Sequence, residues 1–322
     1  MIHVHICYTY PDEALAHLRG LLHPGIGLTV GEEVAPKTTI LVNGRPTREQ
    51  LDNLLHLQAI IVPWAGLPRD LAVLMPDYPH IAVHNLHHNA LPVAEMALTL
   101  LLAAAKQVVP LDQSLRRGDW RPRYDQWGTS LLLQGKTVLV LGYGAIGQHV
   151  GRFCQALGMR VIATRRQPDS DHDGVAEIYP PTALTDLLPQ SQAVIVCLPK
   201  TPETTGYLGA AELALLPDGA VVVNIGRGEV IDEGALYEAL QNGRICAGLD
   251  VWYNYPDNEE ARAHTPPSNY PLHELDNVVF SPHRAGSTDQ TNRLRMEHLA
   301  ELLNTAVAGE PMPNRIDLSA GY

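Results

Sequence analysis

The chain has 322 residues, which is long enough for two domains of ordinary size, each with its own hydrophobic core. With 45% hydrophobic and 18% charged residues, the composition is typical of a folded globular protein and excludes a largely disordered chain. The formal net charge of −12 argues against a general affinity for nucleic acid or anionic membranes, because such surfaces need an excess of Lys and Arg.

The sequence shows no pattern typical of a signal peptide, a membrane-spanning helix or a CxxC cysteine motif. The N-terminal stretch MIHVHICYTYPDEAL has no basic region followed by a long apolar run, so it does not resemble a signal peptide and we expect a cytoplasmic protein. The most apolar segment, residues 91–105, is shorter than the roughly 20 residues that cross a bilayer, which predicts a buried helix and no membrane partner. The four cysteines show no CxxC spacing and are expected to be reduced thiols.

Short runs rich in Ile, Val and Thr alternate with helical stretches in the first part of the chain, a pattern typical of a parallel sheet with crossover helices. The expected strands are IHVHICY, TTILVNG and QAIIVPW. The pattern starts again at residue 137, with TVLVLGYG, RVIATR, AVIVCLP, AVVVNIG, ICAGLDV and NVVFSPH. We therefore predict an α/β protein with two doubly wound parallel-sheet domains.

Two segments flank the second set of strands. Before it come the helix from about Leu91 and then residues 116–136, an irregular polar and aromatic stretch expected to be a connector. After it, residues 289–309 have leucines at helical spacing and a glycine stop, which predicts a helix that returns to the first domain.

A glycine-rich turn opens the second set of strands. An apolar strand runs into Gly142, Gly144 and Gly147, and a helix follows. The first glycine allows a tight turn, the second lets the backbone approach a pyrophosphate, and the third lets helix and strand pack closely. The N-terminus of the helix is then directed at the phosphates. Strand, turn and helix in this order predict a dinucleotide site that includes Ala145 and Ile146.

Two arginines, Arg165 and Arg166, follow the next strand. At this position dinucleotide-binding proteins usually carry an acid that accepts hydrogen bonds from the adenosine ribose. An arginine cannot accept hydrogen bonds, but its guanidinium suits a 2′-phosphate. The pair therefore favours NADP(H), with NAD(H) as a secondary cofactor. A solvated basic turn is the alternative interpretation.

Four blocks of sequence resemble the D-isomer-specific 2-hydroxyacid dehydrogenases, namely residues 92–106, 142–147, 197–252 and 277–288. The resemblance implies a Rossmann dinucleotide-binding domain, residues 98–288, inserted in a flavodoxin-like substrate-binding domain, residues 1–97 and 289–322. It also implies an active site in the cleft and reversible reduction, with NADPH, of a small 2-keto acid such as glyoxylate or hydroxypyruvate to the D-2-hydroxy acid. A homodimer formed through the nucleotide domains is a further implication, and the apolar and aromatic segment 91–135 supports it.

The resemblance assigns roles to individual residues. Arg227, in NIGRG, matches the arginine that polarises the keto oxygen and pairs with the substrate carboxylate. His283, in SPHRAG, matches the acid/base histidine. Pro199 lies in a block that contacts the cofactor, and Asp250 resembles the acid that hydrogen-bonds the nicotinamide carboxamide. For Asp250, a loop-fixing role is the alternative.

The substrate side is less regular. The sequence PWAGLP resembles the family's carboxylate loop, in which main-chain amides around Ala65 and Gly66 would hold the anion. Trp64 and Leu67 either shape a pocket for the substrate side chain or serve in packing alone. His87, near the start of the apolar helix, has no carboxylate or Cys partner at ligand spacing, so no metal site is expected.

One position departs from the family pattern. Five residues after Asp250, where the family usually has a glutamate that orients the histidine, this chain has Tyr255. Glu259 and Glu260 would replace that glutamate only if their loop folds back. Without a carboxylate, we expect His283 to lose its proton at lower pH, so that reductase activity declines earlier as pH rises.

Two other functions are compatible with the resemblance. The family includes enzymes that oxidise formate or phosphite, and a corepressor branch that senses dinucleotides without turnover. The missing glutamate favours the second of these. Retention of both Arg227 and His283 favours an enzyme.

Overall fold

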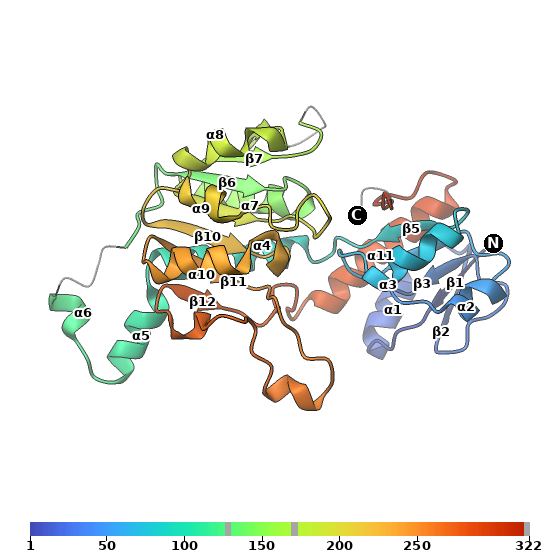
Figure 1. The fold of residues 1–322 in the computed structure, drawn as a ribbon. Helices are drawn as coiled ribbons and strands as arrows, with labels where there is room; N and C mark the ends of the chain where they lie inside the picture. Colours follow the sequence, from blue (N-terminus) through green and yellow to red (C-terminus); the bar gives the residue numbers. More distant parts are fainter. Residues whose placement is uncertain (126–129, 169–172, 319–322) are drawn as a thin grey trace. The chain divides into compact units, whose positions relative to one another are not determined.

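The computed structural model describes residues 1–125, 130–168 and 173–318, and the structural statements below refer to these residues. The chain divides into two compact units (Figure 1). Unit 1 is Met1–Asn89 with Ser287–Tyr322, and unit 2 is Ala90–Gly286. The boundaries expected from the sequence, after residues 97 and 288, lie a little further along the chain.

Unit 1 is built on a five-stranded parallel sheet with the order β2-β1-β3-β4-β5, the flavodoxin-like arrangement. Helices α1 and α11 cover one face of the sheet, and α2 and α3 cover the other. Through α11, the C-terminal part of the chain completes a core that begins with the first strand. The elements are β1 (Ile2–Ile6), α1 (Asp12–Leu21), β2 (Ile26–Val30), β3 (Ile40–Val42), α2 (Arg48–Asn53), β4 (Ala59–Val62), α3 (Arg69–Leu74), η1 (Met75–Asp77), β5 (Ala82–Asn85) and α11 (Thr291–Val307).

Unit 2 is built on a seven-stranded parallel sheet with the order β12-β11-β10-β9-β6-β7-β8. This is the Rossmann order, and it reverses between β6 and β9, where doubly wound proteins bind ligands at the carboxyl ends of their strands. The prediction of two doubly wound parallel-sheet domains is therefore confirmed.

The strands of unit 2 are β6 (Thr137–Leu141), β7 (Arg160–Thr164), β8 (Glu177–Tyr179), β9 (Ala193–Val196), β10 (Ala220–Asn224), β11 (Ile245–Leu249) and β12 (Val278–Phe280). Its helices are α4 (Ala90–Ala105), α5 (Val108–Arg116), α6 (Arg121–Tyr124), α7 (Ala145–Ala156), η2 (Pro181–Ala183), α8 (Leu184–Leu187), η3 (Leu188–Gln190), α9 (Ala210–Ala214), η4 (Gly228–Val230), α10 (Glu233–Gln241), η5 (Glu260–Ala263) and η6 (Leu272–Glu274).

Helix α4, the most apolar segment of the chain, lies in the core of unit 2 against α7, β10 and β11. Gly248 in β11 permits this packing, because a Cβ there would lie 2.7 Å from the Cβ of Leu100. The burial agrees with the helix predicted from composition. In the described parts of the chain, no single helix is long and apolar enough to span a membrane. The helices α4 and α5, which are bent by 63° relative to each other, have that length and apolarity only as a pair.

Helix α6 lies within the expected irregular connector, whereas α5 falls where the helix from about Leu91 was expected to continue. Helices α5 and α6 extend away from the sheet of unit 2 (Figure 1), while residues 126–129 of the aromatic stretch lie outside the described residues. This arm carries several exposed apolar side chains, with exposed fractions of 50% for Val108, 51% for Leu115, 58% for Trp120, 76% for Tyr124 and 64% for Leu132. All four cysteines are free.

Candidate active site

The glycine-rich turn joins β6 to α7 at the reversal of strand order. Gly142 has a φ of +91°, which glycine adopts without strain. A Cβ on Gly147 would lie 2.2 Å from the carbonyl oxygen of Gly142, so only glycine lets α7 begin this close to the turn. A Cβ on Gly144 would meet nothing within 4 Å. No side chain caps α7, so its first amides, at Ala145 and Ile146, can bind phosphate. These residues fit a dinucleotide.

The loop after β9 lies beside this turn, since a Cβ on Gly142 would be 3.1 Å from Leu198. Pro199 follows, and its carbonyl accepts a hydrogen bond from the Thr204 hydroxyl at 2.6 Å. The loop that carries Pro199 is therefore closed on itself next to the glycine turn.

Arg165 comes directly after β7, at the tip of the second strand of the Rossmann order. Its backbone N–H donates to the carbonyl of Tyr179 at 3.0 Å. The pKa of Glu203 is lowered by hydrogen bonds from Thr201 and from its own backbone, and also by the positive charge of Arg166. The carboxylate of Glu203, in the loop after β9, is therefore close enough to Arg166 for the two charges to interact.

The loop after β10 presents Arg227. The buried amide of Asn224 donates to the carbonyl of Arg227 at 2.9 Å and accepts from the N–H of Gly226 at 3.1 Å. A Cβ on Gly228 would lie 2.3 Å from the carbonyl oxygen of Trp252, so this loop packs tightly on the segment after β11. The half-buried guanidinium of Arg227 is held at the carboxyl edge of the sheet.

The turn after β12 presents His283 with a φ of +55°, which is uncommon outside glycine. The carboxylate of Asp250, at the end of β11 and 1% exposed, holds this turn. One of its oxygens accepts from the Ser281 hydroxyl and from the N–H of Arg284 at 2.9 Å, and the other accepts from the N–H of Ala285 at 3.0 Å. These contacts favour the loop-fixing role for Asp250.

Trp252 also holds the end of β12. Its indole N–H donates to the carbonyl of Ser281 at 2.8 Å, and its ring stacks on Phe280 with the centroids 4.8 Å apart. The indole is buried. Trp252 therefore joins the segment after β11 to the strand that leads to His283.

Tyr255 occupies the position beside the histidine. Its hydroxyl oxygen lies 2.9 Å from Nδ1 of His283 and accepts the backbone N–H of Trp252 at 3.1 Å. Glu259 instead pairs with Arg262 at 3.0 Å on the surface. In the part of the chain that the structure describes, no hydrogen bond or ion pair joins Glu259 or Glu260 to His283.

Burial has opposite effects on the two members of this pair, because it lowers the pKa of His283 and raises that of Tyr255. The pKa of His283 is lowered from its usual value by partial burial of the ring and then by the positive charge of Arg227, while Asp250 acts in the other direction. The pKa of Tyr255 is raised, first by partial burial, although the N–H of Trp252 and the charge of Arg227 oppose this. At neutral pH the neutral ring and the intact phenol are therefore the main forms.

In unit 1, the loop after β4 carries Trp64, Ala65 and Gly66. The amide of Asn85 donates to the carbonyl of Ala65 at 2.6 Å, and Nε of Arg295 donates to the carbonyl of Pro63 at 3.2 Å. The loop is thus tied down on both sides of Trp64, at the carboxyl edge of its own sheet.

Trp64 packs inside unit 1. A Cβ on Gly44 would lie 2.4 Å from the indole, so the ring rests directly on the backbone there. Its other face meets Tyr8 edge-on, with the centroids 5.8 Å apart. Trp64 and Leu67 both pack on the core between the sheet and α2 and α3, which supports a packing role for them.

Arg295 places a cationic side chain at the same edge of unit 1. The guanidinium of Arg295 lies 5.4 Å from the centroid of the Tyr10 ring, and no carboxylate of the described residues lies within 4 Å of it. Burial, and then the charges of Arg295, His298 and His87, lower the pKa of His88 to about 3. His88 is therefore a buried neutral ring. Among the described residues, no group of three metal-ligating side chains was found.

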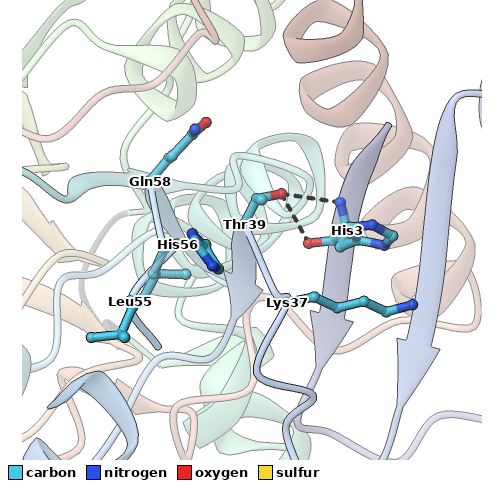
Figure 2. Close-up of a pocket in the computed structure, with 7 residues that line it drawn as sticks. His3, Lys37, Thr39, Leu55, His56 and Gln58 are labelled. Carbon is cyan, nitrogen blue, oxygen red and sulfur yellow. Dashed lines mark hydrogen bonds between the residues drawn. The ribbon is translucent and has the colours of Figure 1, made fainter. Parts of the chain in front are cut away.

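A cavity of about 480 Å³ lies at the opposite edge of unit 1. Figure 2 shows it at the amino ends of β1, β3 and β4, where the Thr39 hydroxyl bonds the backbone of His3. Its lining residues are His3, Lys37, Thr39, Leu55, His56, Leu57 and Gln58. None of the predicted site residues lines this cavity, so it is separate from the candidate chemistry.

Comparisons with known proteins agree with this arrangement. Residues 98–285 match the family model for the NAD binding domain of D-isomer specific 2-hydroxyacid dehydrogenases. The chain belongs to this family. It is 38% identical over 232 residues to a glyoxylate reductase from Aeropyrum pernix, an alignment that covers 70% of this chain and 65% of the relative. It is 34% identical over 232 residues to a D-3-phosphoglycerate dehydrogenase from Archaeoglobus fulgidus, covering 71% of this chain and 41% of the relative.

The chain therefore spans about two thirds, or less, of the length of these curated relatives. Among solved structures, it is similar to a D-isomer specific 2-hydroxyacid dehydrogenase from Xanthobacter autotrophicus Py2 in complex with NADPH and MES. That match has a TM-score of 0.79 and 26% sequence identity, and covers 100% of this chain and 99% of the other. As in the rest of the family, unit 2 is the NAD(P)-binding part of an oxidoreductase fold.

The structure brings Arg227, Asp250, Tyr255 and His283 to the edge of unit 2 that also holds the glycine turn. It adds three residues that the sequence analysis did not single out: Asn224, Trp252 and Arg295. Asn224 and Trp252 adjoin recognised motifs, which is the one signal that could have found them. Arg295 lies on an amphipathic helix, where nothing in the sequence distinguishes it from a surface arginine.

Replacing Asp250 by Asn tests its role. We expect kcat to fall by about a hundredfold, because an amide cannot accept all three hydrogen bonds and His283 would be displaced. The affinity for the dinucleotide, measured by fluorescence titration, should change little. Ser281→Ala, which removes one of the three bonds, serves as the milder control. A large loss of dinucleotide affinity with kcat retained would instead support contact with the nicotinamide.

Proposed function

We propose that this chain reduces small 2-keto acids to D-2-hydroxy acids, with a hydride from NADPH. The observation that carries the proposal is that the loops after β10 and β12 bring Arg227 and His283 to the same carboxyl edge of unit 2, where the positive charge of Arg227 acts on the histidine. The dinucleotide turn lies at the same edge of the same sheet.

Each residue has a defined task in this reaction. A bound dinucleotide would supply the hydride to the carbonyl carbon. Arg227 stabilises the negative charge that develops on the keto oxygen, and His283 provides the proton that this oxygen receives. The amides of Ala65 and Gly66 are proposed to hold the substrate carboxylate. The Tyr255 hydroxyl lies 2.9 Å from Nδ1 of His283, which leaves Nε2 for the substrate.

The substrate class is proposed to be that of glyoxylate and hydroxypyruvate. The glyoxylate reductase relative supports a small substrate, whereas the D-3-phosphoglycerate dehydrogenase relative is almost as similar and acts on a larger one. NADP(H) is the proposed cofactor because Arg165 stands where an acid would repel the 2′-phosphate, and the related Xanthobacter structure contains NADPH. We further propose a cytoplasmic homodimer.

The reaction is tested with a panel of glyoxylate, hydroxypyruvate, pyruvate and 3-phosphohydroxypyruvate, each with NADPH and with NADH. We expect NADPH consumption with at least one small keto acid, and a loss of about a hundredfold or more in His283→Ala, since general acid catalysis contributes this much. Formate or phosphite oxidation with NADP⁺ would favour the first alternative function. Tight NADPH binding without any turnover would favour a dinucleotide sensor.

The cofactor preference is tested by kcat/KM with NADPH and NADH. The native protein should prefer NADPH, and Arg165→Asp should reverse the preference, because it removes a phosphate donor and supplies a ribose acceptor. Glu203→Gln serves as a control with the opposite expected effect. It removes the negative charge near Arg166 and should therefore tighten NADPH binding. Equal or better kcat/KM with NADH in the native protein would refute the preference.

The homodimer is tested by light scattering at micromolar concentration. We expect a dimer that dissociates in Leu115→Asp/Trp120→Asp, because the α5–α6 arm exposes apolar side chains suited to an interface. Leu55→Asp, at a residue that is 87% exposed in unit 1, should leave the mass unchanged. A monomeric mass for the native protein contradicts the proposal.

A further inference from the structure

The hydroxyl of Tyr255 is oriented by the backbone. Its oxygen accepts the N–H of Trp252 at 3.1 Å, so its own hydrogen points elsewhere, and Nδ1 of His283 lies 2.9 Å away. An imidazole nitrogen is a much stronger acceptor than a phenol oxygen, and a phenol is the stronger donor. The phenol therefore donates to Nδ1, and the neutral ring carries its hydrogen on Nε2.

A glutamate at this position would impose the opposite tautomer. A carboxylate only accepts, so it would hold a hydrogen on Nδ1 and leave Nε2 bare in the neutral ring. Such a ring can give a proton to the developing alkoxide only when it is positively charged. With Tyr255 as the partner, the neutral ring already presents an N–H at Nε2, the nitrogen that is free to face a substrate.

Partial burial and the positive charge of Arg227 disfavour a charged ring here, and Asp250 opposes them. Arg227 and Asp250 act on both members of the pair, and Glu229, which is paired with Lys200 at 2.7 Å, acts on Tyr255. Burial and Arg227 lower the pKa of His283, so the imidazolium is a minor species at neutral pH. The phenol keeps its proton throughout this range, because its pKa is raised.

We propose that Tyr255 is a positioning residue that supplies, through His283, the proton consumed in the reduction; the inference rests on the proposed function. As the hydride reaches the carbonyl carbon, the carbonyl π electrons become a lone pair on oxygen. That oxygen takes the proton from Nε2, and Nδ1 takes the proton from the phenol. The phenolate left behind is stabilised by the N–H of Trp252 and by the charge of Arg227.

The transfer is favourable because an alkoxide is a far stronger base than a phenolate. His283 is exposed, so solvent can protonate Nε2, and Nδ1 then returns its proton to the phenolate, which restores the starting tautomer before the next turnover. Reduction then does not depend on the charged form of the histidine. The proposal thus predicts a different pH profile from the early decline expected from the sequence, since that expectation placed the proton on a charged His283.

The pH dependence of kcat/KM for keto-acid reduction tests the proposal. The native protein should keep its activity well above the pKa of His283, and decline only where the phenol ionises. Tyr255→Phe keeps the aromatic ring but removes the proton, so its activity should be greatest at low pH, where His283 is charged, and fall about tenfold per pH unit above the histidine pKa. Tyr255→Glu should decline at a higher pH than Tyr255→Phe, because a carboxylate stabilises the charged ring.

Tyr253→Phe is the matched control. Its hydroxyl donates to the carbonyl of Ile231 at 3.1 Å and not to His283, so its pH profile should overlay the native one. Nitrogen NMR of the histidine ring supplies a readout besides activity, and is expected to show the hydrogen on Nε2 in the native protein.

Either of two results would overturn this inference and leave the proposed function intact. One is a Tyr255→Phe pH profile that coincides with the native profile, and the other is a neutral His283 ring with its hydrogen on Nδ1. Failure of the native protein to reduce any keto acid at any pH would instead remove the proposed function, and this inference with it.

Discussion

The buried carboxylate of Asp250 is the contact on which the rest of the site depends. A charge this deeply buried is costly unless donors surround it, and here the donors are a hydroxyl and two backbone N–H groups of the turn after β12. The same bonds hold His283 in a left-handed conformation that it would otherwise leave. Burial of the charge and placement of the histidine are therefore one constraint.

The close approach of neighbouring loops, which glycines permit, determines the rest of the geometry of the site. A Cβ on Gly142 would lie 3.1 Å from Leu198, so the loop after β6 packs on the loop after β9. A Cβ on Gly226 or Gly228 would overlap the carbonyl oxygen of Leu198 or Trp252, so the loop after β10 packs on the loop after β9 and on the segment after β11. Parallel strands end at the same edge, and a side chain on any of these loops is near the others. Arg227, Tyr255 and His283 meet for this reason, although they are distant in sequence.

Much of this could be predicted from the sequence. Runs of Ile and Val between turn residues indicate buried parallel strands, and the order of strand, glycines and helix indicates the dinucleotide site. The short helix α6 within the connector was missed because four residues are too few to show a helical periodicity. The loop-fixing bonds of Asp250 and the position of Arg295 depend on partners more than 30 and 200 residues away, which no local pattern encodes.

Tyr255 shows why the identity of a residue does not settle its effect. If Tyr255 is considered only as the loss of a carboxylate, it indicates a partner that stabilises the charged form of His283 less well, and hence a less active site. The N–H of Trp252 changes this, because by occupying the phenol oxygen it directs the phenol hydrogen at Nδ1 and fixes which nitrogen of the ring carries a proton. A neutral His283 ring beside the cationic Arg227 also means that only one positively charged group faces the substrate's keto oxygen. The substitution thus suits a site in which the arginine alone carries the charge.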